Sequence, residues 1–116
     1  MSHLRYYAYE GFGQRNLERF SYNQAVRVGD KIERSGQGGC DPETGEFYKE
    51  INAQIDQAFA NVDLDLKDAG GKGWEQVYRV NSYHVPINNE ALGAMVRNLN
   101  KWMPNHRPIW TCVGGD

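Results

Sequence analysis

Apolar positions in the middle of the chain recur every three or four residues, which is typical of an amphipathic helix. The stripe runs from Ile51 to Leu66, and polar side chains such as Asn61 and Asp65 fall on the opposite face. A glycine pair at Gly70 then stops the pattern, as glycine commonly does at the C-terminal end of a helix. The sequence therefore predicts a helix over residues 51–68.

A second helix is indicated by a stripe in the last third of the chain. Asn88 and Asn89 are both good N-cap residues, and Pro104 follows the last apolar position of the stripe. These signals predict a helix over residues 90–103.

Alternating apolar and polar positions predict strands elsewhere. Two such stretches, residues 20–28 and 31–37, are separated by Gly29-Asp30, a good signal for a two-residue hairpin turn of type II′. A third stretch covers Trp74 to Val85 and ends at a proline, and a short one covers Ile109 to Val113.

These elements together predict an α+β domain with the order β-β-α-β-α-β. We expect one mixed sheet with two helices on one face, an N-terminal arm without regular structure over residues 1–19, and a domain over residues 20–116. Residues 36–45 are rich in glycine and contain a proline, so they predict a loop. One helix layer leaves the other face of the sheet bare, which favours self-association.

Composition narrows the classes of function. Thirteen basic residues stand against fifteen acidic ones, so the chain lacks the cationic excess of most nucleic-acid binders. The two cysteines, Cys40 and Cys112, are too few for a small disulfide scaffold and lack zinc-site spacing. No apolar run has the length of a signal peptide core or a membrane span, so we expect a cytoplasmic protein, with a mitochondrial location left open.

Several segments, in order and with matching spacing, resemble the Rid family of YjgF-like proteins, whose older name is endoribonuclease L-PSP. They are Tyr22–Val26, Ser35–Gln37, Asp41–Glu46 and Arg107–Val113. The resemblance implies a chorismate-mutase-like fold, assembled as a homotrimer with ligand clefts between subunits. It also implies hydrolysis of enamines and imines such as 2-aminoacrylate, with no metal or organic cofactor.

The family's functional residues transfer only in part. Its cleft tyrosine falls on Tyr22, the glycine of its Ser-Gly-Gln turn on Gly36, and its late cysteine on Cys112. The arginine that holds the substrate carboxylate falls instead on Trp110, and the family's helix asparagine falls near Val96. The resemblance places a late glutamate on a further strand, which lies beyond residue 116.

Each candidate site residue also has a purely structural interpretation. Trp110 is either an aromatic platform for a ligand or a packing residue of the core or an interface. Arg107 is either a replacement anion clamp or an exposed arginine beside a turn, and Cys112 is either a reactive thiol or a small buried residue. Cys40 lies in the glycine-rich loop, where we expect it to be more exposed.

His84 and His106 have no partner in a known motif, so the sequence favours structural roles over acid–base chemistry for both. Three functions remain open. The first is an enzyme-like cleft that acts on a small reactive metabolite but is not a standard 2-aminoacrylate deaminase. The second is a non-enzymatic trimeric module that binds a small molecule. The third, RNA cleavage, is disfavoured by the acidic balance.

Overall fold

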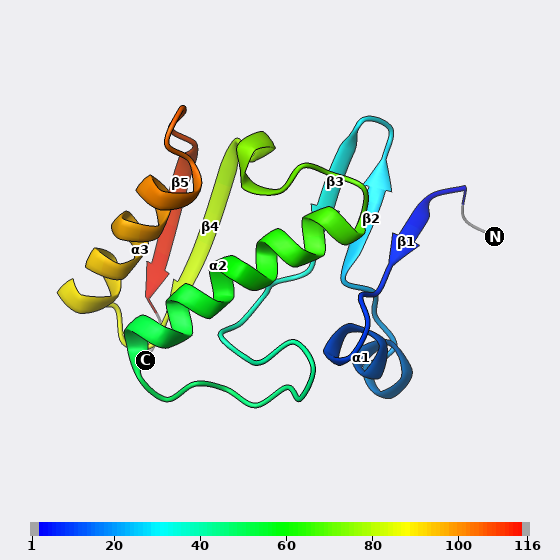
Figure 1. Cartoon of the computed structure of the whole chain (residues 1–116), viewed down its shortest axis with the longest axis horizontal. Helices are drawn as coiled ribbons and strands as arrows, with labels where there is room; N and C mark the ends of the chain where they lie inside the picture. Colours follow the sequence, from blue (N-terminus) through cyan, green and yellow to red (C-terminus); the bar gives the residue numbers. More distant parts are fainter. Residues whose placement is uncertain (1–2, 115–116) are drawn as a thin grey trace.

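Two long helices lie across a layer of short strands in the computed structural model, which describes residues 3–114 and has the predicted α+β fold (Figure 1). Residues 1–2 of the expected N-terminal arm and residues 115–116 of the expected domain lie outside the described residues. The elements are β1 (Arg5–Tyr7), α1 (Phe12–Phe20), β2 (Ala25–Val28), β3 (Lys31–Arg34), α2 (Ile51–Asp68), a 3₁₀ turn η1 (Gly73–Gln76), β4 (Arg79–His84), α3 (Asn89–Trp102) and β5 (Ile109–Gly114).

The strands form two hydrogen-bonded sheets rather than the single sheet that we expected. β1, β2 and β3 form an antiparallel sheet in that order, and β4 pairs with β5 in parallel. Within residues 3–114 no ladder joins β3 to β4, although both lie in one layer behind α2 (Figure 1). The two sheets are therefore held together by packing against α2 and not by backbone hydrogen bonds.

The predicted helices and hairpin are confirmed. α2 spans the predicted residues, and α3 begins after Asn88, whose side chain accepts a hydrogen bond from the Ala91 backbone N–H. The hairpin pairs Val28 with Lys31, and Gly29 at its tip has a φ of 61° while Asp30 does not have a positive φ. These values fit the type II′ turn, which needs glycine at its first central position.

The N-terminal segment was predicted wrongly. It contains β1 and α1, and α1 extends to Phe20, so the strand that we expected from residue 20 begins only at Ala25. Gly11, at a φ of 87°, precedes the helix, and the Phe12 N–H donates to the Pro42 carbonyl at 2.8 Å. The helix ends at Ser21, which adopts a left-handed conformation with a φ of 63°. A contact with a distant loop therefore helps to fix the start of this helix.

The core lies between α2, α3 and β4. The Trp74 ring stacks on the Phe59 ring, with 4.6 Å between centroids, and its indole N–H donates to the Phe59 carbonyl at 2.8 Å. This anchoring places Trp74 in the 3₁₀ turn rather than in the expected strand, which starts only at Arg79.

One side of α2 that the sequence pattern assigned to solvent is buried. Asn61 and Asp65 are 1% and 0% exposed, and the loop after β3 folds back against Asn61. The Asn61 amide donates to the carbonyls of Gly38 and Cys40, at 2.9 and 2.7 Å. A Cβ on Gly39 would lie 2.3 Å from the backbone of α2, so this close approach requires glycine. Cys40 is buried as a result, contrary to our expectation of an exposed thiol.

Within residues 3–114, nothing covers the face of the β4–β5 sheet that is turned away from the helices, as the sequence predicts. Along β4, Val80 and His84 are buried, whereas Tyr83 between them is 75% exposed. On β5, Ile109 and Val113 are 67% and 45% exposed. This face therefore presents apolar side chains that a second protein surface could cover.

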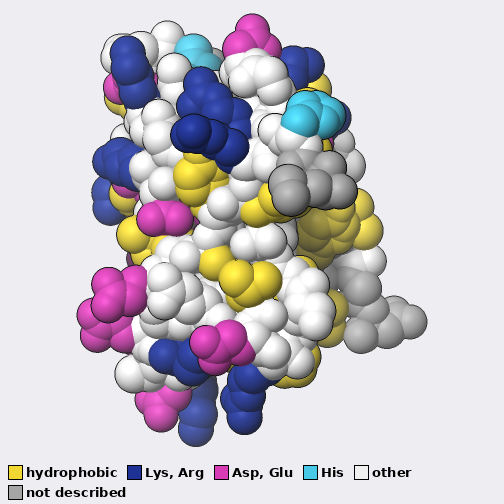
Figure 2. Space-filling view, turned by 90° about the vertical axis from the view of Figure 1, so that its right-hand side faces the viewer, with side chains coloured by type: hydrophobic (Ala, Val, Ile, Leu, Met, Phe, Trp, Pro, Cys, Tyr) yellow, Lys and Arg dark blue, Asp and Glu magenta, His cyan; other side chains and the backbone are white. Residues whose placement is uncertain are grey.

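Charges of both signs mix on the side of the molecule that carries β1. Figure 2 views the molecule from the side that carries β1, and there basic and acidic side chains alternate without a field of one sign. Among residues 3–114 there is also no helix with the length and apolarity needed to cross a bilayer.

Candidate functional site

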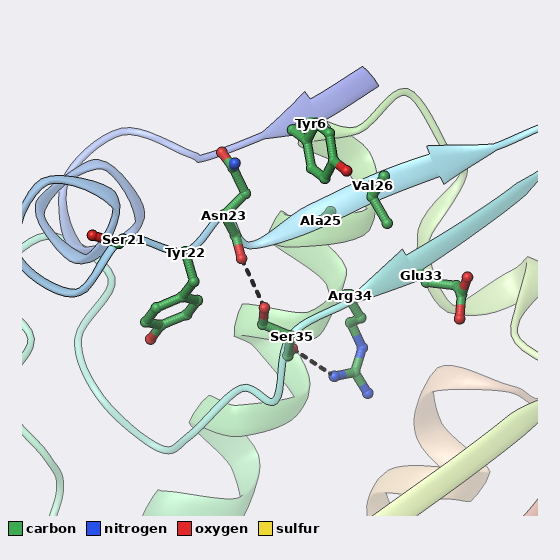
Figure 3. Close-up of a pocket in the computed structure, with 9 residues that line it drawn as sticks. All are labelled: Tyr6, Ser21, Tyr22, Asn23, Ala25, Val26, Glu33, Arg34 and Ser35. Carbon is green, nitrogen blue, oxygen red and sulfur yellow. Dashed lines mark hydrogen bonds between the residues drawn. The ribbon is translucent and has the colours of Figure 1, made fainter. Parts of the chain in front are cut away.

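A hollow of about 480 Å³ lies where the link from α1 to β2 meets the end of β3 (Figure 3). Its size is within the range of small-molecule sites. Tyr22 and Asn23 border it from the link, and Arg34 and Ser35 border it from the end of β3. Tyr6 of β1 completes the rim. We call this hollow the β3 pocket.

Local hydrogen bonds fix the shape of the β3 pocket. The Ser35 hydroxyl donates to the Asn23 carbonyl at 2.7 Å, which ties the end of β3 to the start of β2. The Tyr22 hydroxyl accepts a hydrogen bond from the Asn16 amide of α1 at 2.9 Å. Tyr22 keeps 40% of its surface exposed and lies on the opposite side of Ser35 from Arg34 (Figure 3). The side chains of Tyr22 and Arg34 thus extend from the two sides of Ser35 rather than towards one another (Figure 3).

Arg34 and Asp65 are the unusual charges near this pocket. Burial lowers the pKa of Arg34, and the nearby charge of Asp65 partly opposes this shift. Burial raises the pKa of Asp65 to about 7, and the charge of Arg34 counteracts part of the rise. Neither carboxylate oxygen of Asp65 has a hydrogen-bond partner among residues 3–114, and no ion pair joins it to Arg34 there. The two charges are close enough to influence each other without being in contact.

A chain of polar side chains begins at Tyr9, which is close enough to Asp65 for the charge of Asp65 to affect its pKa. The Tyr9 hydroxyl donates to Gln37 at 2.9 Å, and the Gln37 amide donates to Gln24 at 2.7 Å. The Gln24 amide nitrogen is buried and has no partner among the residues that the structure describes. Burial, and then the charge of Asp65, raise the pKa of Tyr9, so its hydroxyl stays protonated.

Trp110 is part of the β4–β5 framework. Its side chain packs against the core, and its indole N–H donates to the Ser82 hydroxyl at 2.9 Å. That hydroxyl lies 3.0 Å from Nε2 of His84, whose pKa is lowered by burial. A neutral His84 can accept the Ser82 proton while Ser82 accepts from Trp110. Cys112, opposite Ser82 in the ladder, is half-buried.

Arg107 and His106 hold the turn between α3 and β5. The Arg107 guanidinium donates to the Met103 carbonyl at 2.9 Å, and Nε2 of His106 lies 2.7 Å from the Val77 carbonyl. Both side chains therefore bind backbone carbonyls, in line with the structural interpretation of the two residues.

The candidate residues do not come together within one chain. Tyr22 and Gly36 lie beside the three-stranded sheet, whereas Trp110, Cys112 and Arg107 lie on or next to β5, at the opposite end of the molecule (Figure 1). Two further residues were missed by sequence reasoning. Arg34 had no motif to mark it, and Asp65 was assigned to the solvent side of α2.

Comparison with known proteins identifies the family. The sequence profile of the family described as Endoribonuclease L-PSP matches residues 14–115. The chain belongs to the Rid family. A RutC family protein of Aquifex aeolicus is 42% identical over 66 residues, which cover 57% of this chain and 52% of that protein. A RutC family protein of Pyrococcus abyssi is 37% identical over 71 residues, which cover 60% of this chain and 55% of that protein. The chain thus spans about half the length of these curated relatives.

Solved structures agree with the Rid fold. RidA from an Antarctic Psychrobacter species has a TM-score of 0.71 at 27% identity, with 95% of this chain and 80% of that chain covered. The protein YJGH has a TM-score of 0.79 at 23% identity, with 95% and 82% covered, which supports the fold alone.

Proposed function

We propose that this Rid protein binds a small reactive metabolite in clefts between subunits and that it is not a standard 2-aminoacrylate deaminase. The proposal is supported by the distance, within one chain, between two groups of candidate residues. Tyr22 and Gly36 lie far from Trp110 and Cys112 in one chain, so a cleft that contains both sets needs a second copy. A neighbouring subunit would bring its β5 against the β3 pocket. Arg107 lies at the start of the β5 side of such a cleft.

The tryptophan at position 110 also argues against the standard deamination of 2-aminoacrylate. A substrate carboxylate needs a cation or a set of hydrogen bonds when it leaves water. The single N–H of Trp110 is already bound to Ser82, and the ring face repels anions. The same observation favours the alternative of a binding module without catalysis.

The decisive assay generates 2-aminoacrylate with a dehydratase and follows its decay with and without the protein. We expect the protein to accelerate this decay roughly ten- to hundred-fold less than an arginine-bearing Rid protein, since a charge-assisted hydrogen bond contributes about 1.5–3 kcal/mol. Acceleration equal to that of the arginine-bearing protein would contradict the proposal. A metabolite whose decay is accelerated would establish an enzyme, whereas binding without turnover would establish the binding module.

We also expect a homotrimer in solution. The exposed apolar side chains of Tyr83, Ile109 and Val113 favour burial between subunits. Light scattering at micromolar concentration should give three times the mass of the chain. Replacing Tyr83 by glutamate should shift the mass towards the monomer, whereas replacing the exposed Phe47, which lies outside this face, should not. A stable monomer of the unaltered protein would contradict the expectation.

A further inference from the structure

The Trp110 side chain is turned along the sheet towards the C-terminal ends of β4 and β5. The ladder places Trp110 opposite Val80, whereas its indole N–H donates to the hydroxyl of Ser82, two residues further along β4, at 2.9 Å. Since a strand rises about 3.3 Å per residue, the indole has to reach roughly 6–7 Å along the sheet to make this bond. The hydrogen bond therefore fixes the direction in which the ring points.

A second hydrogen bond orients the Ser82 hydroxyl. Nε2 of His84, the next residue on the same face of β4, lies 3.0 Å from it. An indole N–H is only a donor, so the Ser82 oxygen accepts from Trp110 and its own proton is left for His84. His84 is 8% exposed and burial lowers its pKa, which favours the neutral ring that can accept this proton. The three side chains thus form one directed chain of hydrogen bonds.

The surroundings of His84 leave this chain free of other charges. Burial is the one cause of the lowered pKa of His84, and no charged side chain of β5, α2 or α3 in the described part of the protein adds to it. The titratable side chain next to the hydrogen bonds is Cys112, which lies opposite Ser82 in the ladder. Protonation of His84 would turn Nε2 into a donor and leave the Ser82 proton without this acceptor. The hydrogen bond of Trp110 should therefore respond to the charge of His84.

These contacts decide what Trp110 can offer a ligand. The side chain is half-buried and its N–H is bound to Ser82, so the part that stays exposed presents aromatic carbon and no donor. The face of an aromatic ring attracts cations and repels anions. We propose that Ser82 and His84 are positioning residues of the cleft, which hold the Trp110 indole so that its aromatic surface binds a cationic group of the ligand. This inference rests on the proposed function, because that function places Trp110 in the cleft.

The indole N–H of Trp110 tests the hydrogen bonds without a ligand. In ¹⁵N spectra of the full chain between pH 4.5 and 8, we expect its signal to shift with the titration of the His84 ring, at a midpoint below the ordinary 6.5. His84→Gln keeps an acceptor for Ser82 and should lose only the shift with pH. Ser82→Ala should lose this shift, and Ser82→Thr, which keeps the hydroxyl, should retain it. His106→Gln is the matched control and should keep the shift, since His106 binds the Val77 carbonyl instead.

Choline and 3,3-dimethylbutanol test the class of ligand, because they have nearly the same shape and differ by one positive charge. We expect choline to shift the ring signals of Trp110 and to bind about two- to five-fold more tightly than the neutral alcohol, as for a cation at an exposed aromatic ring. Ser82→Ala should remove this preference, whereas Ser82→Thr should keep it.

Two results would overturn this inference. An indole signal of Trp110 that ignores the titration of His84, or that shifts equally in Ser82→Ala, would remove the positioning roles of Ser82 and His84. Equal affinities for choline and the alcohol in the unaltered chain would rule out the cationic ligand. Both results leave the proposed function standing, since the decay of 2-aminoacrylate tests it separately and does not depend on the indole signal.

Discussion

Replacing Asp65 by asparagine should stabilise the protein by about 2–4 kcal/mol at pH 8 and change its stability little at pH 4. The side chain is fully buried, and its oxygens have no donors among residues 3–114. Burial raises its pKa to about 7, with the charge of Arg34 opposing the rise and the charge of Asp68 adding to it. The folded protein therefore disfavours the ionised carboxylate.

The sign of the effect follows from the two pKa values. In the unfolded chain the carboxyl titrates near pH 4, whereas in the folded chain it titrates at about 7. Between these values the folded state holds a proton that the unfolded state has lost. Stability from this group is therefore fully present below about pH 4, and it falls by about 1.4 kcal/mol per pH unit as the pH rises towards the folded pKa. Asparagine carries no such proton, so the variant should not show this fall.

Urea unfolding at pH 4.5, 6 and 8 measures the difference, at one protein concentration because association adds to stability. Glu18→Gln is the matched control, since it removes a carboxylate charge from an exposed position of α1 that is not among the charges acting on Asp65. We expect the control to change the free energy of unfolding by a few tenths of a kcal/mol at every pH. An Asp65→Asn variant that is no more stable than the unaltered protein at pH 8 would show that the carboxylate is compensated in the folded state.

The sequence predicted the elements whose signals are local. The α2 helix has both a regular apolar stripe and a terminal glycine pair, and the hairpin has Gly29 at the one position where a positive φ is needed. The α1 helix was missed because its start depends on a contact with Pro42, thirty residues from Phe12 in the chain. Trp74 was assigned to a strand because aromatic residues favour strands, but stacking on Phe59 outweighs that preference.

The site was less accessible to sequence reasoning, since it depends on tertiary contacts. Tyr22 was found through the family resemblance, and it does border the β3 pocket. Arg34 and Asp65 were not found, because helical periodicity describes one buried face and the loop that covers the second face of α2 is irregular. A charged residue directly before the Ser35–Gln37 turn was the one local signal available, and only the structure shows that Asp65 lies near it.

Replacing Trp74 by alanine should cost about 3–5 kcal/mol, the usual cost of removing a buried tryptophan. The side chain is 3% exposed and is the aromatic contact that joins the 3₁₀ turn to α2, through the stack on Phe59 and the hydrogen bond to its carbonyl. Alanine would leave a cavity between α2 and the start of β4. Since a domain of this size has a total stability of roughly 5–15 kcal/mol, the variant should lose a large part of its stability.

Trp74→Phe separates packing from hydrogen bonding. It keeps a ring against Phe59 and loses the indole N–H, so we expect a smaller loss of about 1–2 kcal/mol. Phe20→Ala is the control for removing an aromatic side chain, because Phe20 is 66% exposed at the end of α1 and its loss should cost less than about 0.5 kcal/mol. Urea midpoints followed by far-ultraviolet circular dichroism rank the three variants. A cost for Trp74→Ala no larger than that for Phe20→Ala would mean that the 3₁₀ turn does not depend on the stack, and β4 would then owe its position to its ladder with β5.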